Sequence, residues 1–186
     1  MPVPKITVFG GSMPRPGEAA YRQAQQLGYS LAEKGFTVIT GGYIGTMEAV
    51  SRGAAEAGGH VIGVTCDEIE TWRPVGPNPW VLEERRYPTV RQRLYALIDL
   101  CDAALALPGG IGTLVEIGAM WSQLQVKHAN LPRRPLLLIG SGWKVTFETF
   151  INQQGMYVAE KDRSLIQFVE DEAEAVNRLS SLLVIS

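Results

Sequence analysis

The chain has few of the side chains that build disulfide frameworks or metal centres. Its 186 residues include two cysteines, Cys66 and Cys101, too few and too far apart for a disulfide scaffold or a thiolate metal cage. They also include only two histidines, His60 and His128, which argues against a histidine-ligated metal. We therefore expect no metal and no cofactor. The scarcity of cysteine is typical of proteins of the reducing cytoplasm.

The sequence also lacks an excess of charge and a long hydrophobic run. It has 17 Lys and Arg residues against 19 Asp and Glu residues, so its net charge of −2 provides no basic field for nucleic acid or an anionic membrane. No stretch approaches the roughly 20 apolar residues of a membrane-spanning helix, and residues 1–10 lack the pattern of a secretory leader. We expect a cytoplasmic protein that binds neither nucleic acid nor membrane, in which any anion site is local.

The sequence does contain a regular alternation of short apolar runs and helical periods, which predicts one domain over residues 1–186. Strands are expected at 6–9, 36–40, 61–64, 80–82, 103–107, 135–139 and 165–169. Helices are expected at 19–33, 47–57, 90–101, 112–126, 144–153 and 171–183. Residues 65–88 are rich in proline, so the strand at 80–82 is expected to interrupt a long irregular connection. This alternation predicts an α/β fold, a Rossmann-like doubly wound parallel sheet with helices on both faces.

Paired glycines end three of the expected strands, at Gly10-Gly11, Gly41-Gly42 and Gly109-Gly110. The carboxyl ends of parallel strands meet at one edge of a sheet, where ligands of such folds bind. The second and third pairs lead directly into helices, whose first N–H groups are free to bind an anion. Glycine also lets the backbone approach a ligand closely. The alternative is that these glycines only make turns, but their recurrence at one edge favours a phosphate site.

Two common phosphate motifs are absent from the sequence. No G-x-x-x-x-G-K-[ST] occurs, which argues against Walker-type hydrolysis of a nucleoside triphosphate. The first strand is not followed by G-x-G-x-x-G, and the second ends in Thr40-Gly41-Gly42 without the acidic residue that binds the ribose of NAD. A mononucleotide or a sugar phosphate is therefore the expected ligand.

A longer motif follows the fifth expected strand. Residues 108–116, Pro-Gly-Gly-Ile-Gly-Thr-Leu-Val-Glu, resemble the PGGxGTxxE signature of the LONELY GUY (LOG) family. Residues 8–12 and 40–48 are similar to two other glycine-containing turns of that family, and Arg93 precedes Glu116 by the family's offset of 23 residues. Members are cytokinin nucleoside 5′-monophosphate phosphoribohydrolases, long labelled lysine decarboxylases. The scattered lysines of this chain do not suit pyridoxal chemistry, because none follows a glycine-rich strand end.

The resemblance implies hydrolysis of the N-glycosidic bond of a nucleoside 5′-monophosphate, AMP or an N6-modified AMP, to free base and ribose 5-phosphate. It implies that Arg93 and Glu116 are catalytic. A carboxylate suits this chemistry because positive charge builds on the sugar in the transition state. The residues that the resemblance assigns to the nucleotide and its phosphate are Gly11, Ser12, Gly41, Gly42, Gly45, Gly109, Gly110, Gly112 and Thr113.

Helical geometry alone gives the two catalytic candidates less distinctive places. In helix 112–126 it leaves Glu116 off the expected core face, where a solvated surface glutamate is the alternative. In helix 90–101 it places Arg93 beside the apolar stripe, where an arginine can present its fork to phosphate, base or Glu116 or be an ordinary surface charge. The motif favours the functional role for both. The expected core face of helix 112–126 consists of Ile111, Leu114, Gly118, Trp121 and Gln125.

Three positions depart from the plant-type members of the family. Arg91 and Leu94 stand where those members have His and Lys, and Val115 replaces the first glutamate of a Glu-Glu pair. These departures bear on cytokinin specificity and on rate.

The alternative to an enzyme is a carrier that binds a phosphorylated ligand without cleaving it, similar to molybdenum-cofactor carrier proteins. Retention of Arg93 and Glu116 favours the enzyme.

The resemblance also implies a homodimer. Val115, Ala119 and Met120 lie outside the expected core face of helix 112–126, which gives this helix apolar surface on a second side. Two-fold symmetry would pair such patches and bring the helices that carry Arg93 and Glu116 beside their symmetry mates. The expected partners are thus a small nucleotide or sugar phosphate and a second copy of the chain.

Overall fold

The computed structural model describes residues 3–127 and 134–183, so the expectation for His128 lies outside the described residues. The strands are β1 (Lys5–Phe9), β2 (Thr37–Thr40), β3 (Val61–Cys66), β4 (Glu83–Tyr87), β5 (Ala103–Ala106), β6 (Leu136–Ile139) and β7 (Gln167–Val169). The helices are α1 (Ala19–Glu33), α2 (Thr46–Glu56), α3 (Asp67–Trp72), α4 (Val90–Asp99), α5 (Ile111–Lys127), α6 (Ser141–Gln154), the short 3-10 helix η1 (Gly155–Tyr157), α7 (Glu160–Arg163) and α8 (Glu172–Leu182). None of the helices in these ranges is both long enough and apolar enough to cross a bilayer.

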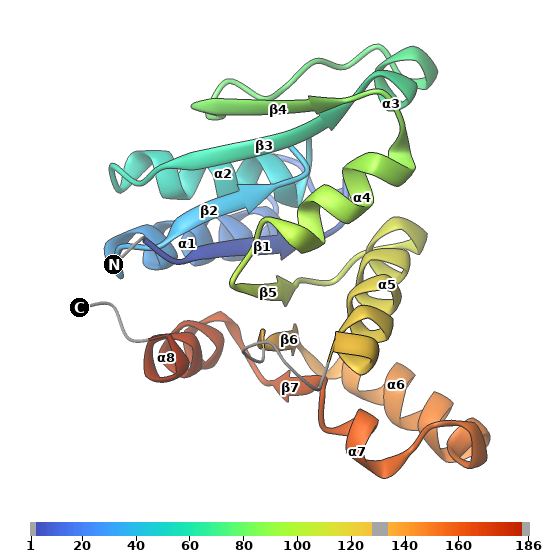
Figure 1. Cartoon of the computed structure of the whole chain (residues 1–186). Coiled ribbons are helices and arrows are strands. Elements are labelled where there is room, and N and C mark those ends of the chain that lie inside the picture. Colours follow the sequence, from blue (N-terminus) through green and yellow to red (C-terminus); the bar gives the residue numbers. More distant parts are fainter. Residues whose placement is uncertain (1–2, 128–133, 184–186) are drawn as a thin grey trace.

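The seven strands form one sheet in the order β4-β3-β2-β1-β5-β6-β7, and every neighbouring pair is parallel. Strand order reverses on the two sides of β1, so the boundary between β1 and β5 is the topological switch point where ligands bind in doubly wound sheets. Figure 1 shows the arrowheads of β1–β5 directed toward one side of the molecule. The predicted Rossmann-like α/β fold is confirmed.

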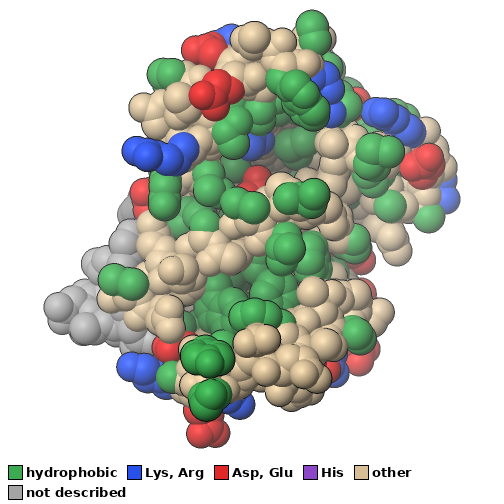
Figure 2. Space-filling view, turned by 90° about the vertical axis from the view of Figure 1, so that its right-hand side faces the viewer, with side chains coloured by type: hydrophobic (Ala, Val, Ile, Leu, Met, Phe, Trp, Pro, Cys, Tyr) green, Lys and Arg blue, Asp and Glu red, His purple; other side chains and the backbone are tan. Residues whose placement is uncertain are grey.

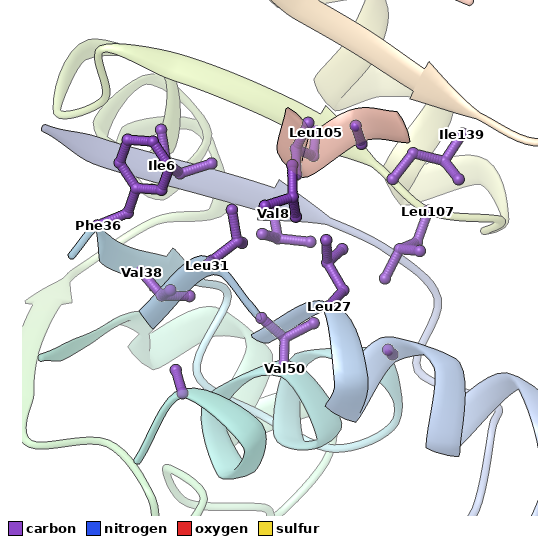
Figure 3. Packing of buried hydrophobic residues seen from close by; sticks show 14 of the residues in the cluster. Ile6, Val8, Leu27, Leu31, Phe36, Val38, Val50, Leu105, Leu107 and Ile139 are labelled. Atoms are coloured by element: carbon purple, nitrogen blue, oxygen red, sulfur yellow. The ribbon is translucent and has the colours of Figure 1, made fainter. Parts of the chain in front are cut away.

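Helices cover both faces of the sheet, which explains why its central strands are buried along almost their whole length. On one face, α1, α2 and α8 pack against strand residues that include Ile6, Val38 and Leu105 (Figure 3). On the other face, α4, α5 and α6 pack against residues such as Ile39 and Ala104. This second layer carries the two catalytic candidates, because Arg93 belongs to α4 and Glu116 to α5.

The predicted strand at residues 80–82 is wrong. The strand of this region is β4, a charged segment whose side chains alternate between half-buried and exposed, as at the edge of a sheet. The apolar Val81 instead covers Gly63 of β3, where a Cβ would lie 2.6 Å from the Val81 side chain. The short helix α3 follows β3 without a connecting loop and was not predicted, because six residues show too little helical periodicity.

The predicted core face of α5 is also wrong in part, since of the large apolar side chains on that face only Trp121 packs against the core. The side chains buried beneath this helix are those of Thr113, Ile117 and Met120, whereas Ile111 is 84% exposed and Leu114 is 44% exposed. Because α5 is apolar on more than one side, periodicity fits two faces and does not say which one meets the sheet. Met120 therefore belongs to the core of the subunit and cannot contact a partner.

Candidate functional site

Three glycine-rich turns, after β1, β2 and β5, are joined by backbone hydrogen bonds at the carboxyl edge of the sheet. The Gly11 N–H donates to the Pro108 carbonyl oxygen across 3.3 Å. The Gly11 carbonyl oxygen accepts from the Thr46 N–H at 2.9 Å and from the Thr46 hydroxyl at 2.8 Å. The structure thus brings together the three turns that the sequence singled out, at the switch point between β1 and β5.

Glycine is required by geometry at several of these positions. Gly45 has φ +76°, and a Cβ there would lie 2.5 Å from the Ser12 Cα. Gly42 also has a positive φ, +77°, and its N–H donates to the Thr40 hydroxyl at 3.1 Å. These backbone groups are buried, so they set the conformation of the turn but do not form its exposed surface.

The exposed surface of the site is the turn after β5 and the first residues of α5. A Cβ at Gly110 or Gly112 would meet no described atom within 4 Å, so both glycines border open space. The buried Thr113 side chain lies against Gly109, where a Cβ would be 2.1 Å from Thr113 Oγ1. The first N–H groups of α5 are therefore the groups placed to bind an anion, while Thr113 holds the turn.

Arg93 is buried, with a side chain only 9% exposed, and it crosses from α4 to the ends of β2 and β3. Its Nε–H donates to the Val64 carbonyl oxygen at 2.7 Å and its Nη2 to the Gly41 carbonyl oxygen at 2.9 Å. A Cβ at Gly41 would lie 1.9 Å from Nη2, so only glycine leaves room for this guanidinium. The sequence predicted Arg93 at the margin of the apolar stripe, but the structure places it on the buried side of α4.

The guanidinium of Arg93 also points to Glu116. Arg93 Nη1 lies 3.9 Å from Glu116 Oε1, close enough for an electrostatic interaction and too far for a direct hydrogen bond. The Glu116 side chain is 14% exposed, which excludes a fully solvated glutamate. Its burial raises the pKa of the Glu116 carboxyl to about 7, although the positive charge of Arg93 opposes the rise.

This arrangement combines a turn whose helix N–H groups are placed to bind an anion with a buried cation and carboxylate. Two N–H donors of Arg93 are held by carbonyl oxygens, while Nη1 faces the carboxylate. A hydroxyl group of a ligand can therefore bridge Nη1 and Glu116 Oε1, donating to the carboxylate and accepting from the guanidinium. The phosphate of a ligand would then bind at the turn after β5 and its sugar at Arg93 and Glu116, next to each other at the carboxyl edge of the sheet.

Figure 2 views the side toward which β1–β5 point and shows hydrophobic side chains gathered in the middle of this face. Two small cavities adjoin the turn after β5. One, of about 230 Å³, is lined by Gly109, Trp143 and neighbouring residues of α6. The other, of about 240 Å³, extends from Thr46 and Pro108 toward the start of α8. Among the described residues, no group of three or more His, Cys, Asp or Glu side chains is placed to hold a metal.

Sequence reasoning missed two residues that support the site. The ring of Tyr43 lies 5.5 Å from the Arg93 guanidinium carbon. The buried Asn78 donates from Nδ2 to the carbonyl oxygens of Gly42 and Tyr43, each at 3.0 Å, and so fixes the turn after β2. Tyr43 lies within the second glycine-rich turn, which could have marked it. Asn78 lies in the proline-rich connection, where no periodic pattern marks it.

Comparison with known proteins agrees with these motifs. The family described as "Possible lysine decarboxylase" matches residues 47–179. "Cytokinin riboside 5′-monophosphate phosphoribohydrolase LOG" of Oryza sativa subsp. japonica is 32% identical over 94% of this chain and 72% of its own length. "Cytokinin riboside 5′-monophosphate phosphoribohydrolase" of Rhodococcoides fascians is 31% identical over 74% of this chain and 69% of its own. A third relative, the probable phosphoribohydrolase LOGL5 of Oryza sativa subsp. japonica, is 35% identical over 67% of this chain, which spans about half (51%) of that relative.

Solved structures share the whole fold of this chain. The molybdenum cofactor binding protein from Rippkaea orientalis superimposes with a TM-score of 0.77 over 99% of both chains, at 22% identity. The molybdenum cofactor carrier protein from Chlamydomonas reinhardtii gives a TM-score of 0.75 over 99% of this chain and all of its own, at 23% identity. At these identities the likeness concerns the fold alone. The match over residues 47–179 and the relatives of about 30% identity or more show that the chain belongs to the LONELY GUY (LOG) family, whose model is described as "Possible lysine decarboxylase".

Proposed function

We propose that this protein is a phosphoribohydrolase that cleaves the N-glycosidic bond of a nucleoside 5′-monophosphate. The observation that carries the proposal is the pair formed by Arg93 and Glu116, buried beside the anion-binding turn after β5. A site that only held a phosphate would need the turn but not a desolvated carboxylate. The phosphoribohydrolase names of its relatives at 31–32% identity support the same chemistry.

In this reaction water adds across the bond between the base and C1′ of the ribose. The bonding electron pair leaves with the base, the water oxygen binds C1′, and the two protons of water end on the new hydroxyl and the base. Positive charge develops on the sugar as the bond breaks. Glu116 in its carboxylate form would stabilise this charge and bind a ribose hydroxyl, and the low exposure of the pair would strengthen the interaction.

The remaining residues of the site would bind and orient the nucleotide. The N–H groups at Gly110, Ile111 and Gly112 would hold the 5′-phosphate at the start of α5. Gly11, Ser12 and the turn from Gly41 to Gly45 would shape the groove beside it, and Arg93 would contact the ribose through Nη1. The substrates we propose are AMP and N6-modified AMP.

The alternative function is non-catalytic binding of a phosphorylated ligand. A molybdenum cofactor binding protein has the same fold, with a TM-score of 0.77, so this fold is compatible with such binding. The positions of Arg93 and Glu116 favour the hydrolase. A protein that retained a nucleotide or another phosphorylated ligand without cleaving it would support the carrier.

We also propose that the protein acts as a homodimer in the cytoplasm. Ile111, Leu114 and Val115 expose apolar surface beside the anion-binding turn, where a second copy could cover it. Both thiols, Cys66 and Cys101, are free and buried, which suits a reducing compartment.

The test is an assay for free base after incubation of the pure protein with a panel of nucleoside monophosphates. The wild-type protein should release base from at least one of them. Glu116→Ala and Arg93→Ala should each lower kcat by about 10²-fold or more, because both side chains act mainly in the transition state. Glu33→Ala, at the exposed end of α1, is the matched control and should keep full activity. Unchanged base release in both site variants would contradict the assignment.

A further inference from the structure

The Tyr43 side chain occupies a place next to the catalytic candidates that neither the motif nor the proposed reaction explains. Tyr43 lies in the turn after β2 and is only 1% exposed. The face of its ring lies 5.5 Å from the Arg93 guanidinium carbon, within the range of a cation–π interaction. Two donors on one edge of the Arg93 guanidinium bind backbone oxygens at 2.7 and 2.9 Å. The Tyr43 ring covers one face of the same group.

The hydroxyl of Tyr43 fixes the ring to the junction of β3 and α3. The Cys66 N–H donates to Tyr43 Oη at 2.8 Å. The hydroxyl itself lies 3.1 Å from the Cys66 carbonyl oxygen and 3.3 Å from Glu70 Oε1, both of which can accept its proton. Glu70 in turn pairs with Arg86 of β4 at 2.8 Å. The hydroxyl is a donor at neutral pH, because the usual pKa of tyrosine is 10 and burial raises the pKa of Tyr43 further.

We propose that Tyr43 is a positioning residue that holds the Arg93 guanidinium toward Glu116. The ring is the operative part, because it contacts the cation directly. The hydroxyl network sets where the ring lies. Without the ring, the guanidinium gains freedom to turn away from Glu116, and Nη1 no longer stays at its separation of 3.9 Å from the carboxylate. The part of this inference that concerns catalysis rests on the proposed phosphoribohydrolase activity.

The decisive measurement is the pKa of the Glu116 carboxyl, followed by carbon NMR as the pH is varied. Arg93 is the charged side chain that lowers this pKa, and burial raises it. Replacement of the ring in Tyr43→Leu should therefore raise the pKa of Glu116 by about one unit, because the stabilising cation moves away. Tyr43→Phe keeps the ring and should leave the pKa near that of the wild-type protein. Tyr21→Leu is the matched control, since Tyr21 is equally buried but belongs to α1, on the opposite face of the sheet from α4 and α5.

The activity assay supplies a second readout. Tyr43→Leu should lower kcat by about tenfold with a smaller change in KM, because misplacement of a group that acts in the transition state affects the chemical step. Tyr43→Phe should recover most of that loss. If the wild-type protein releases no base, the phosphoribohydrolase proposal fails, whereas the NMR measurement still decides the role of Tyr43.

A measurement on the wild-type protein covers the case in which Tyr43→Leu does not fold. The Arg93 side-chain protons should show nuclear Overhauser contacts with the ring protons of Tyr43, because the guanidinium carbon lies 5.5 Å from the ring centre. Absence of these contacts in the folded protein would overturn the proposal. The same conclusion would follow from a folded Tyr43→Leu variant whose Glu116 pKa equals that of the wild-type protein.

Discussion

The charge state of Glu116 depends on a balance between burial and one nearby cation. The carboxyl has lost most of its contact with water, and burial raises its pKa from the usual 4.5 to about 7. Arg93 opposes this rise, but at 3.9 Å it does not donate a direct hydrogen bond to the carboxylate. Because its pKa lies near neutrality, the carboxyl changes charge within the physiological range of pH.

The first prediction concerns pH and activity. If the carboxylate is the active form, base release by the wild-type protein should increase as pH rises through about 7, as Glu116 loses its proton. Glu116→Gln cannot ionise and should lose both this increase and most of its activity. The measurement is kcat/KM for AMP across the pH range. A profile that falls through pH 7 would show that the protonated acid is the active form and would contradict the proposed role.

The same shift has a consequence for stability, with a sign that follows from linkage. The pKa is raised in the folded state, so its stabilising contribution is complete below 4.5 and is lost as pH rises toward 7. Urea unfolding at about pH 5 and about pH 8 should show a loss on the order of 1–3 kcal/mol in the wild-type protein. Glu116→Gln should not show that part of the loss.

At the scale of elements, the turn after β2 depends on a loop from elsewhere in the chain. The side chain of Asn78 is buried, and its Nδ2 donates to the carbonyl oxygens of Gly42 and Tyr43. Its Oδ1 accepts from the Trp80 N–H at 3.2 Å. One side chain thus binds the connection between α3 and β4 to the floor of the candidate site.

The second prediction follows from these bonds. Asn78→Ala should lower the free energy of unfolding by about 1–3 kcal/mol, because the buried Tyr43 carbonyl oxygen loses its side-chain donor. The Gly42 carbonyl oxygen keeps the backbone N–H of residue 78 as a donor, at 2.8 Å. Urea unfolding measures the loss, and the dependence on urea should not change. Asn177→Ala, at an exposed position of α8, is the control and should have little effect. Equal stability of the Asn78 variant and the wild-type protein would show that these bonds do not stabilise the turn.

The elements differ in how well the sequence predicted them. Strands β1, β2, β3, β5 and β6 are buried apolar runs, and pattern alone locates them. Strand β4 was misplaced because an edge strand can be charged, while the apolar Trp80-Val81-Leu82 run is typical of a buried strand. In the structure this run is a loop in which Val81 covers Gly63 of β3 and Leu82 is 65% exposed. The local pattern does not distinguish an apolar loop that packs on a strand from the strand itself.

The candidate site was predicted by motif more than by helical geometry. Periodicity placed Glu116 off the core face of its helix and placed Arg93 beside the apolar stripe of a different helix. Both side chains are nevertheless mostly buried. Their burial depends on contacts between distant segments, such as that of Arg93 with Gly41 and Val64. Such contacts follow from the order of strands in the sheet. The glycine-rich turn marks Tyr43 as close to the site, but a single sequence does not show that its ring lies against that guanidinium.

At the scale of the whole molecule, the carboxyl edge of the sheet places the proposed anion-binding turn beside an apolar surface. Ile111, Leu114 and Val115 are separated by three and four residues and therefore share one side of α5. They are 84%, 44% and 50% exposed. A contiguous apolar surface beside a ligand site is typical of a surface that another protein covers. The homodimer remains a prediction, and we expect its interface at these residues in place of Met120.

The third prediction tests that assembly. Light scattering at micromolar concentration should give a mass of about twice 20.3 kDa, and Leu114→Glu should reduce it because a charge would have to be buried between the two subunits. Val126→Glu is the control, because it adds the same charge to an 81% exposed position near the other end of α5 and should leave the dimer intact. Met120→Glu would instead place a charge inside the core of one subunit and destabilise its fold, so it cannot report on assembly.

A wild-type mass near 20.3 kDa would exclude the dimer. A dimer that withstands Leu114→Glu would place the interface on a different surface, and the apolar side of α5 would then have to be covered by something other than a second copy.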